Sequence, residues 1–177
     1  MHIRLSLALL SALAAPLLVS TARADDCPLL KAVYAPLDPE DDMSASVGEQ
    51  NTYRVRHVEG RREHSDSSYV MRLTEEKQKI GYNFGFVHLD GYGGIALIFL
   101  GSGLPRAPYQ IKSADPQSRI MYFGSDLKAV EPDRENPGAA PAYLIMPQIG
   151  NSFWYWTPGK RKFVPPPGLW KIVSCGG

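Results

Sequence analysis

Aromatic and cationic side chains gather near the C-terminal end of the chain. Trp154 and Trp156 are followed by a Pro-Gly turn and then by Lys160, Arg161 and Lys162. Indole rings offer flat apolar surface, and cations beside them can orient an acidic partner, contact the ring faces or accompany stacking on sugars. The stretch is therefore the first candidate for a binding surface.

The same stretch has a second interpretation as part of the core. We expect a strand over 152–157, which places Phe153 and Tyr155 on one face and Trp154 and Trp156 on the other. One pair of rings then belongs to the core while the other is partly displayed. In the alternative interpretation all four rings are buried and the cations only keep the turn soluble.

The histidines offer a weaker candidate site. His57, His64 and His88 are not part of a His-Glu-x-x-His pattern, and no third ligand stands at a recognisable metal spacing. The sequence therefore predicts neither a metal site nor a cofactor. His88 lies two residues before Asp90 at the mouth of an expected hairpin, and it is the best general base if the protein is an enzyme.

Nucleophile motifs give no catalytic assignment. The chain has no Gly-x-Ser-x-Gly elbow. Ser125 and Lys128 have the Ser-x-x-Lys spacing, but the Ser-Asp-Asn and Lys-Thr-Gly motifs that complete such a site are absent. We expect no catalytic residue from motifs alone.

Residues 1–24 have the composition of a secretory signal peptide. Arg4 precedes an apolar run over 5–19, and Ala22-Arg23-Ala24 has the small-x-small arrangement of a cleavage site. The apolar run is shorter than the roughly 20 residues that span a bilayer as a helix. We therefore predict a cleaved signal and a periplasmic or secreted protein.

The remaining residues, 25–177, are expected to form a single β-rich domain. Removing Arg4 and Arg23 changes the formal charge from +1 to −1, which gives no global attraction to nucleic acid. We expect no membrane span after signal cleavage, because the longest later apolar run covers only 95–100.

The chain has two cysteines, one near each end of the expected mature protein. An exported protein meets oxidising conditions, so Cys27 and Cys175 are predicted to form a disulfide that joins the termini. The chain-entropy model gives such a long loop a stabilisation of up to about 5 kcal/mol.

Alternation of apolar and polar residues in short segments favours an antiparallel β-protein. The clearest hairpin joins 79–89 to 95–100, and the second segment has no polar member, so it should be covered on both faces. The segment 27–33 is expected to form at most one or two helical turns before Pro36. Other candidate strands cover 52–58, 69–73, 119–123, 142–149, 152–157, 162–164 and 169–174. The predicted fold is mainly β, a single antiparallel β-sandwich or partly open β-barrel with little helix.

These features favour a non-catalytic binding or interaction domain of the cell envelope. An envelope protein or a polysaccharide is the expected partner, and Trp154, Trp156, Lys160, Arg161 and Lys162 are the expected contacts. Two alternatives remain open. One is a small periplasmic hydrolase with a site near His88 and Asp90, and the other is a structural component of an envelope assembly.

Overall fold

A single antiparallel sheet makes up most of the protein. The computed structural model describes residues 26–37, 52–60, 65–89, 94–102, 118–156 and 163–176. Within them the sheet has nine strands: β1 (Ala32–Pro36), β2 (Tyr53–Glu59), β3 (Tyr69–Glu75), β4 (Ile80–His88), β5 (Ile95–Ser102), β6 (Ser118–Phe123), β7 (Ala129–Val130), β8 (Tyr143–Ile145) and β9 (Leu169–Cys175).

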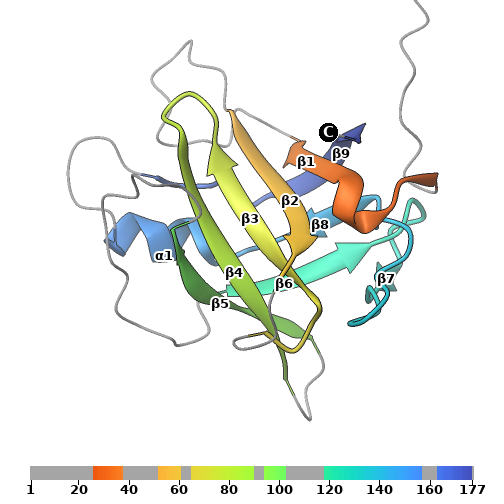
Figure 1. Ribbon diagram of the computed structural model, residues 1–177. Helices are drawn as coiled ribbons and strands as arrows, with labels where there is room; N and C mark the ends of the chain where they lie inside the picture. Colours follow the sequence, from red (N-terminus) through yellow and green to blue (C-terminus); the bar gives the residue numbers. More distant parts are fainter. Residues whose placement is uncertain are drawn as a thin grey trace, which may run out of the picture.

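Eight of these strands close into a barrel (Figure 1). The strands β1, β2, β3, β4, β5 and β6 pair in that order. The ring is completed because β6 pairs with β8, β8 pairs with β9, and β9 pairs with β1. The short β7 is an extra strand that pairs with the end of β6. The prediction of a mainly β fold is confirmed. The strands close around one interior, so they form a barrel and not a sandwich.

The two ends of the barrel differ. At the disulfide end, Cys27 is bonded to Cys175, which joins the segment before β1 to the end of β9. The predicted disulfide is thus confirmed. The helix end carries α1 (Ile149–Trp156) between β8 and β9. Because neighbouring strands are antiparallel, β2, β4 and β6 all finish at the disulfide end.

Aromatic side chains fill the described interior of the barrel. Barrels of eight strands have an interior just wide enough for side chains to fill. The large fully buried side chains with a Phe, Tyr or Trp ring are Tyr34, Tyr69, Tyr82, Phe84, Phe86, Tyr122, Phe153, Phe163 and Trp170. Phe153 comes from α1, and its ring centroid lies 4.9 Å from that of Tyr82 and 4.8 Å from that of Phe163. The helix therefore plugs its end of the barrel.

The strand expected over 152–157 is wrong, because these residues up to Trp156 belong to α1. Burial of Ile149, Gly150 and Phe153 follows the period of a helix and not that of a strand. Gly150 permits the close packing, since a Cβ there would lie 2.5 Å from the carbonyl oxygen of Pro165.

Of the one or two helical turns expected over 27–33, the structure has one, and the residues from Ala32 onward are extended. A single 3-10 turn, η2 (Leu29–Lys31), leads directly into β1. Backbone pairing with β2 on one side and β9 on the other explains the extended conformation from Ala32 onward.

The hairpin of β4 and β5 is confirmed, with His88 opposite Ile95. The expected cover of β5 on both faces is wrong, since Ile98 and Leu100 are partly exposed on the outer wall. β8 ends before Pro147, which lacks the N–H that a ladder needs. Of the strand expected over 162–164, residues 163 and 164 are not in a strand and residue 162 lies outside the described part.

Candidate functional site

Only part of the predicted aromatic and cationic surface falls within the described residues. Trp154 points away from the core, and 46% of its surface is exposed. Trp156 is the last residue of α1, but its side chain is outside the described part, as are all of 160–162. The sequence predicted that some rings of this stretch are buried and others displayed. Among the described side chains this holds for Phe153, which is buried, and Trp154, which is exposed.

The outer wall of the barrel over β2, β3 and β4 is mostly polar, although Val58, Val70 and Val87 also lie on its outward face. Its outward side chains there include Arg54, Arg56, Arg72, Thr74 and Asn83, all partly or fully exposed. Arg72 Nε donates a hydrogen bond to Asn83 Oδ1 at 3.1 Å across the sheet. This is the composition expected of a wall that faces water.

The wall over β6, β8 and β9 is apolar instead. We call its outward apolar side chains the apolar strip, which consists of Met121, Phe123, Tyr143, Ile145, Leu169 and Val173. The register places Met121 opposite Ile145, and Ile145 opposite Leu169. Met121 is 40% exposed and Val173 is 46% exposed.

These three strands carry two charged residues, and both are cations. Arg119 lies two residues before Met121 on β6, and Lys171 stands opposite Tyr143 in the sheet. Both cations are exposed. The helix that carries Trp154 also contacts β6. The apolar strip thus has the cations Arg119 and Lys171 beside it, and the neighbouring helix α1 exposes the Trp154 ring.

His88 lies between two carboxylates at the disulfide end. Its Nε2 is 3.2 Å from Glu131 Oε1 and its Nδ1 is 3.8 Å from Asp66 Oδ2, and neither contact is a hydrogen bond. The His88 backbone N–H donates to Asp66 Oδ2 at 2.9 Å. Asp90, which the sequence paired with His88, lies outside the described residues.

This arrangement does not assemble a nucleophile and a base. A general base of the Ser-His-Asp kind needs one ring nitrogen facing a carboxylate and the other facing the nucleophile. In His88 both ring nitrogens face carboxylates. The described residues also contain no group of three His, Cys, Asp or Glu side chains that could hold a metal ion.

His57 is fully buried in the barrel interior near the same end. Its Nε2 is 2.7 Å from the Tyr122 hydroxyl, and its ring stacks on Phe86 at a centroid distance of 5.9 Å. Burial lowers the pKa of His57 to about 3, so the ring is neutral at physiological pH. Burial likewise raises the pKa of Tyr69, which contacts the His57 ring, to about 12.

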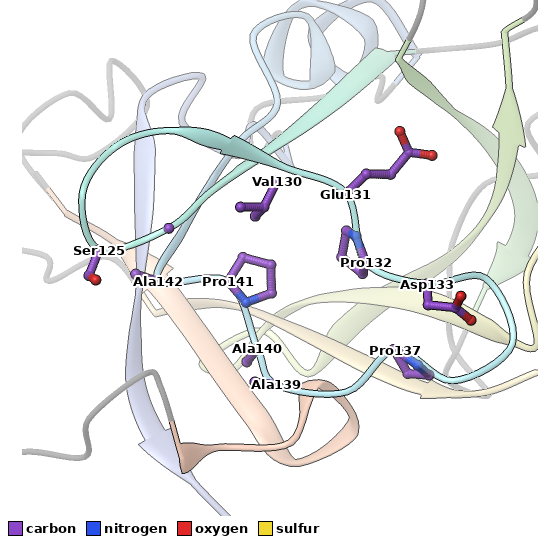
Figure 2. A pocket seen from close by; sticks show the side chains of 11 residues that line it. Ser125, Val130, Glu131, Pro132, Asp133, Pro137, Ala139, Ala140, Pro141 and Ala142 are labelled. Carbon is purple, nitrogen blue, oxygen red and sulfur yellow. The ribbon is translucent and has the colours of Figure 1, made fainter.

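Sequence reasoning did not find the pocket at the disulfide end. We call it the rim pocket; it has a volume of about 240 Å³ and lies within the segment that leaves β6, forms β7 and returns to β8. Its lining residues are Gly124, Ser125, Val130, Glu131, Pro132, Asp133, Pro137, Ala139, Ala140, Pro141 and Ala142. Figure 2 shows this segment curving around the pocket, with Pro132 and Pro141 near its centre. The one signal of the pocket in the sequence is the proline-rich run over 131–141.

Comparison with known proteins gives no relative. No family model, no curated protein and no solved structure matches the chain. Among the residues that the structure describes, no helix has the length and apolar character needed to cross a membrane.

Proposed function

We propose that the protein is an exported, non-catalytic binding domain that docks on another envelope protein through its apolar strip. The observation that carries this proposal is the contrast between the two sides of the outer wall. The outward face of β2 to β4 carries three arginines, Thr74 and Asn83 beside valines, whereas Met121, Ile145 and Leu169 form an outward row across β6, β8 and β9. Contiguous exposed apolar surface of this kind marks interaction sites.

The charges on the strip favour a particular kind of partner. Arg119 and Lys171 are exposed, and β6, β8 and β9 contribute no carboxylate. A partner protein with an apolar patch edged by Asp or Glu would be complementary in both respects. The apolar side chains would supply contact area and the two cations would orient the complex.

Two further features support a binding role in an exported protein. Side chains fill the described barrel interior, so a partner is engaged from outside. The Cys27–Cys175 disulfide suits the oxidising conditions that exported proteins meet. A small hydrolase at His88 has less support, because both ring nitrogens face carboxylates.

The proposal is tested by site-specific photo-crosslinking in the native envelope. A photoreactive phenylalanine analogue replaces Met121 in one variant and Thr74, on the polar wall, in a control variant. We expect a protein that crosslinks at position 121 and not at position 74. The captured protein is then purified and its affinity measured by calorimetry against the parent and against an Arg119→Glu, Lys171→Glu variant.

The outcomes separate the possible occupants of the strip. Binding of the purified protein that weakens at least tenfold in the double variant supports the proposal. Crosslinking to a second copy of the same chain, or to polysaccharide alone, overturns it. Equal crosslinking at positions 121 and 74 also overturns it, because the apolar wall would then have no selectivity.

A further inference from the structure

The hairpin that joins β6 to β7 carries an exposed leucine in its loop. Leu127 is 62% exposed, the largest exposed fraction of any large apolar side chain in the described part of the chain. Single exposed leucines are common on protein surfaces, so the exposure alone does not indicate a function. The unusual feature of Leu127 is its backbone conformation.

The loop of this hairpin has three residues, Ser125, Asp126 and Leu127. The Leu127 N–H donates to the Gly124 carbonyl oxygen at 3.0 Å, and the Gly124 N–H donates to the Lys128 carbonyl oxygen at 2.9 Å. Three-residue hairpin loops typically combine a β-turn with a final residue in the left-handed region, where glycine is the usual residue. Leu127 occupies that position, with a φ of 60°.

A leucine makes this backbone conformation costly. In the left-handed region the Cβ of any residue other than glycine lies too close to the carbonyl oxygen that follows. The other described residues with positive φ are glycines, apart from Lys79 in the turn between β3 and β4. Leu127 therefore departs from two local preferences, because it is apolar at an exposed position and is not glycine at a left-handed one. Such departures concentrate at functional sites.

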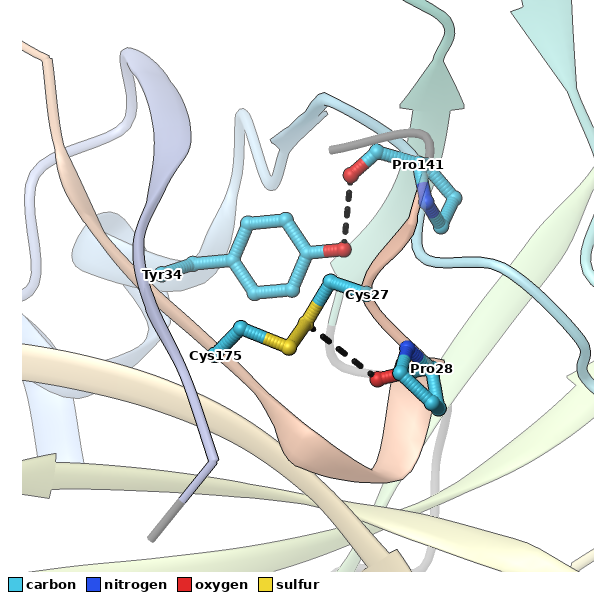
Figure 3. Close-up of a disulfide and its surroundings, with 5 residues drawn as sticks. All are labelled: Cys27, Pro28, Tyr34, Pro141 and Cys175. Atoms are coloured by element: carbon cyan, nitrogen blue, oxygen red, sulfur yellow. Dashed lines mark hydrogen bonds between the residues drawn. A yellow bond between two sulfur atoms is a disulfide. The ribbon is translucent and has the colours of Figure 1, made fainter. Parts of the chain in front are cut away.

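Further contacts hold the hairpin and the segment that follows it. Asp126 Oδ1 accepts the Lys128 N–H at 3.1 Å, and Asp126 Oδ2 lies 2.7 Å from Lys128 Nζ. Where the segment returns to β8, the Tyr34 hydroxyl donates to the Pro141 carbonyl oxygen at 2.8 Å, beside the disulfide (Figure 3). A loop fixed in this way loses little conformational entropy when it binds a partner.

The hairpin continues the apolar strip at the disulfide end of the barrel. Phe123, a member of the strip, lies opposite Tyr143 on one side and opposite Ala129 of β7 on the other. Paired residues of neighbouring strands share a face of the sheet, so Ala129 extends the outward apolar row, and it is exposed. The row therefore reaches β7, which begins two residues after Leu127.

We propose that Leu127 anchors the docked complex, because its side chain enters an apolar pocket of the envelope protein that covers the apolar strip. This inference rests on the docking function proposed above and names a contact residue for it. In many interfaces a few side chains that fill pockets of the partner supply most of the binding energy. The contact in the complex offsets the backbone cost of a leucine in this loop. The partner accordingly has a pocket for one isobutyl group next to its apolar patch.

Substitution by glycine separates a role in binding from a role in folding. Leu127→Gly removes the side chain and suits the left-handed conformation. We expect this variant to unfold in urea at a midpoint equal to or above that of the parent, because glycine adopts positive φ without strain. A midpoint below that of the parent would show that the leucine stabilises the fold, and this would overturn the proposal.

Binding is measured by calorimetry with the purified protein that the photoreactive analogue at position 121 captures. Leu127→Gly should bind this protein at least tenfold more weakly than the parent does. Lys79→Gly is the matched control, because it makes the same change at a left-handed position between two strands outside the strip, and its affinity should be unchanged. An affinity of Leu127→Gly within threefold of the parent, or an equal loss in Lys79→Gly, contradicts the anchor.

A photoreactive analogue at Ser125, in the same loop, distinguishes failure of the anchor from failure of the docking function. Capture of one protein at both positions 121 and 125, with the capture at 125 lost in Leu127→Gly, supports the anchor. Capture at 121 alone overturns the anchor and leaves the docking function in place. Capture at neither position, or at 125 alone, overturns both. Co-sedimentation with phosphatidylethanolamine–phosphatidylglycerol vesicles that is lost in Leu127→Gly would place the leucine in a membrane and would also overturn the anchor.

Discussion

At the scale of single residues, His57 has the most unusual surroundings. The rings of Tyr34, Tyr69, Phe86 and Tyr122 all contact it, and its Nδ1 has no hydrogen-bond partner within the described residues. Charging the ring there would leave a cation without a counter-ion in an apolar environment. His57 is thus a neutral core residue whose protonation and folding oppose each other.

A pH dependence of stability follows from the depressed pKa. The unfolded chain takes up a proton near pH 6.5, whereas the folded protein does so only near pH 3. Stability from this source is complete above about pH 6.5 and falls as the pH decreases toward 3, by at most about 1.4 kcal/mol per pH unit. Urea unfolding at pH 7, 6, 5 and 4 should show this slope. A His57→Gln variant, which can still bond the Tyr122 hydroxyl, should show a shallower one.

Comparison with His88→Gln separates the two described histidines. If His57→Gln keeps the full slope of the parent, protonation of other groups explains the pH dependence and His57 is not its source.

Residue-scale sequence reasoning succeeded where few alternatives existed. Two cysteines allow one pairing, and the structure has that pairing. The sequence also indicates that His57 points inward, because it shares one face of the 52–58 segment with Tyr53 and Val55. Its complete burial was not visible, since that depends on the rings of β1, β4 and β6 around it.

At the scale of elements, α1 shows how a local pattern can mislead. The run Phe153-Trp-Tyr-Trp156 is apolar at every position, so it has no period that separates a helix from a strand. The interior decides between them, because Phe153 packs between Tyr82, Phe84 and Phe163 at the helix end. Before β1, the local pattern gives one 3-10 turn, and pairing with β2 and β9 keeps the residues from Ala32 onward in a strand.

Two neighbouring aromatic residues of α1 should respond very differently to substitution by alanine. Phe153→Ala removes a fully buried ring and should cost about 3–5 kcal/mol of unfolding free energy. Trp154→Ala removes a ring that is 46% exposed and should cost about 1 kcal/mol or less. Urea unfolding followed by circular dichroism measures both. Similar losses in the two variants would mean that α1 does not plug the barrel through Phe153.

At the scale of the whole molecule, the two candidate surfaces depend on residues far apart in the sequence. The apolar strip needs the register of β6, β8 and β9, which brings Met121 opposite Ile145 and Ile145 opposite Leu169. The rim pocket needs the contact of Ala140 with Cys27. Local alternation predicts strands but not which strands are neighbours. The fold class was therefore predictable, and neither surface was.

The disulfide links barrel closure to the rim pocket. Cys27 and Cys175 are separated by 148 positions, and their bond holds the start of β1 against the end of β9. Cys27 also accepts the Ala140 N–H through its carbonyl oxygen. Loss of the bond should therefore lower global stability and loosen the disulfide end more than the helix end.

A Cys27→Ala, Cys175→Ala variant tests this coupling. We expect it to lose about 3–5 kcal/mol of unfolding free energy, because its unfolded chain is no longer cross-linked. Amide hydrogen exchange under native conditions should accelerate most at Leu29, Ala140 and Gly176, whose N–H groups bond across the disulfide end. The Ser152 amide, which donates to the Gln148 carbonyl oxygen at the start of α1 and so lies at the opposite end, is the internal reference. Equal acceleration at both ends would show that the bond acts on the unfolded chain alone and does not position the walls of the rim pocket.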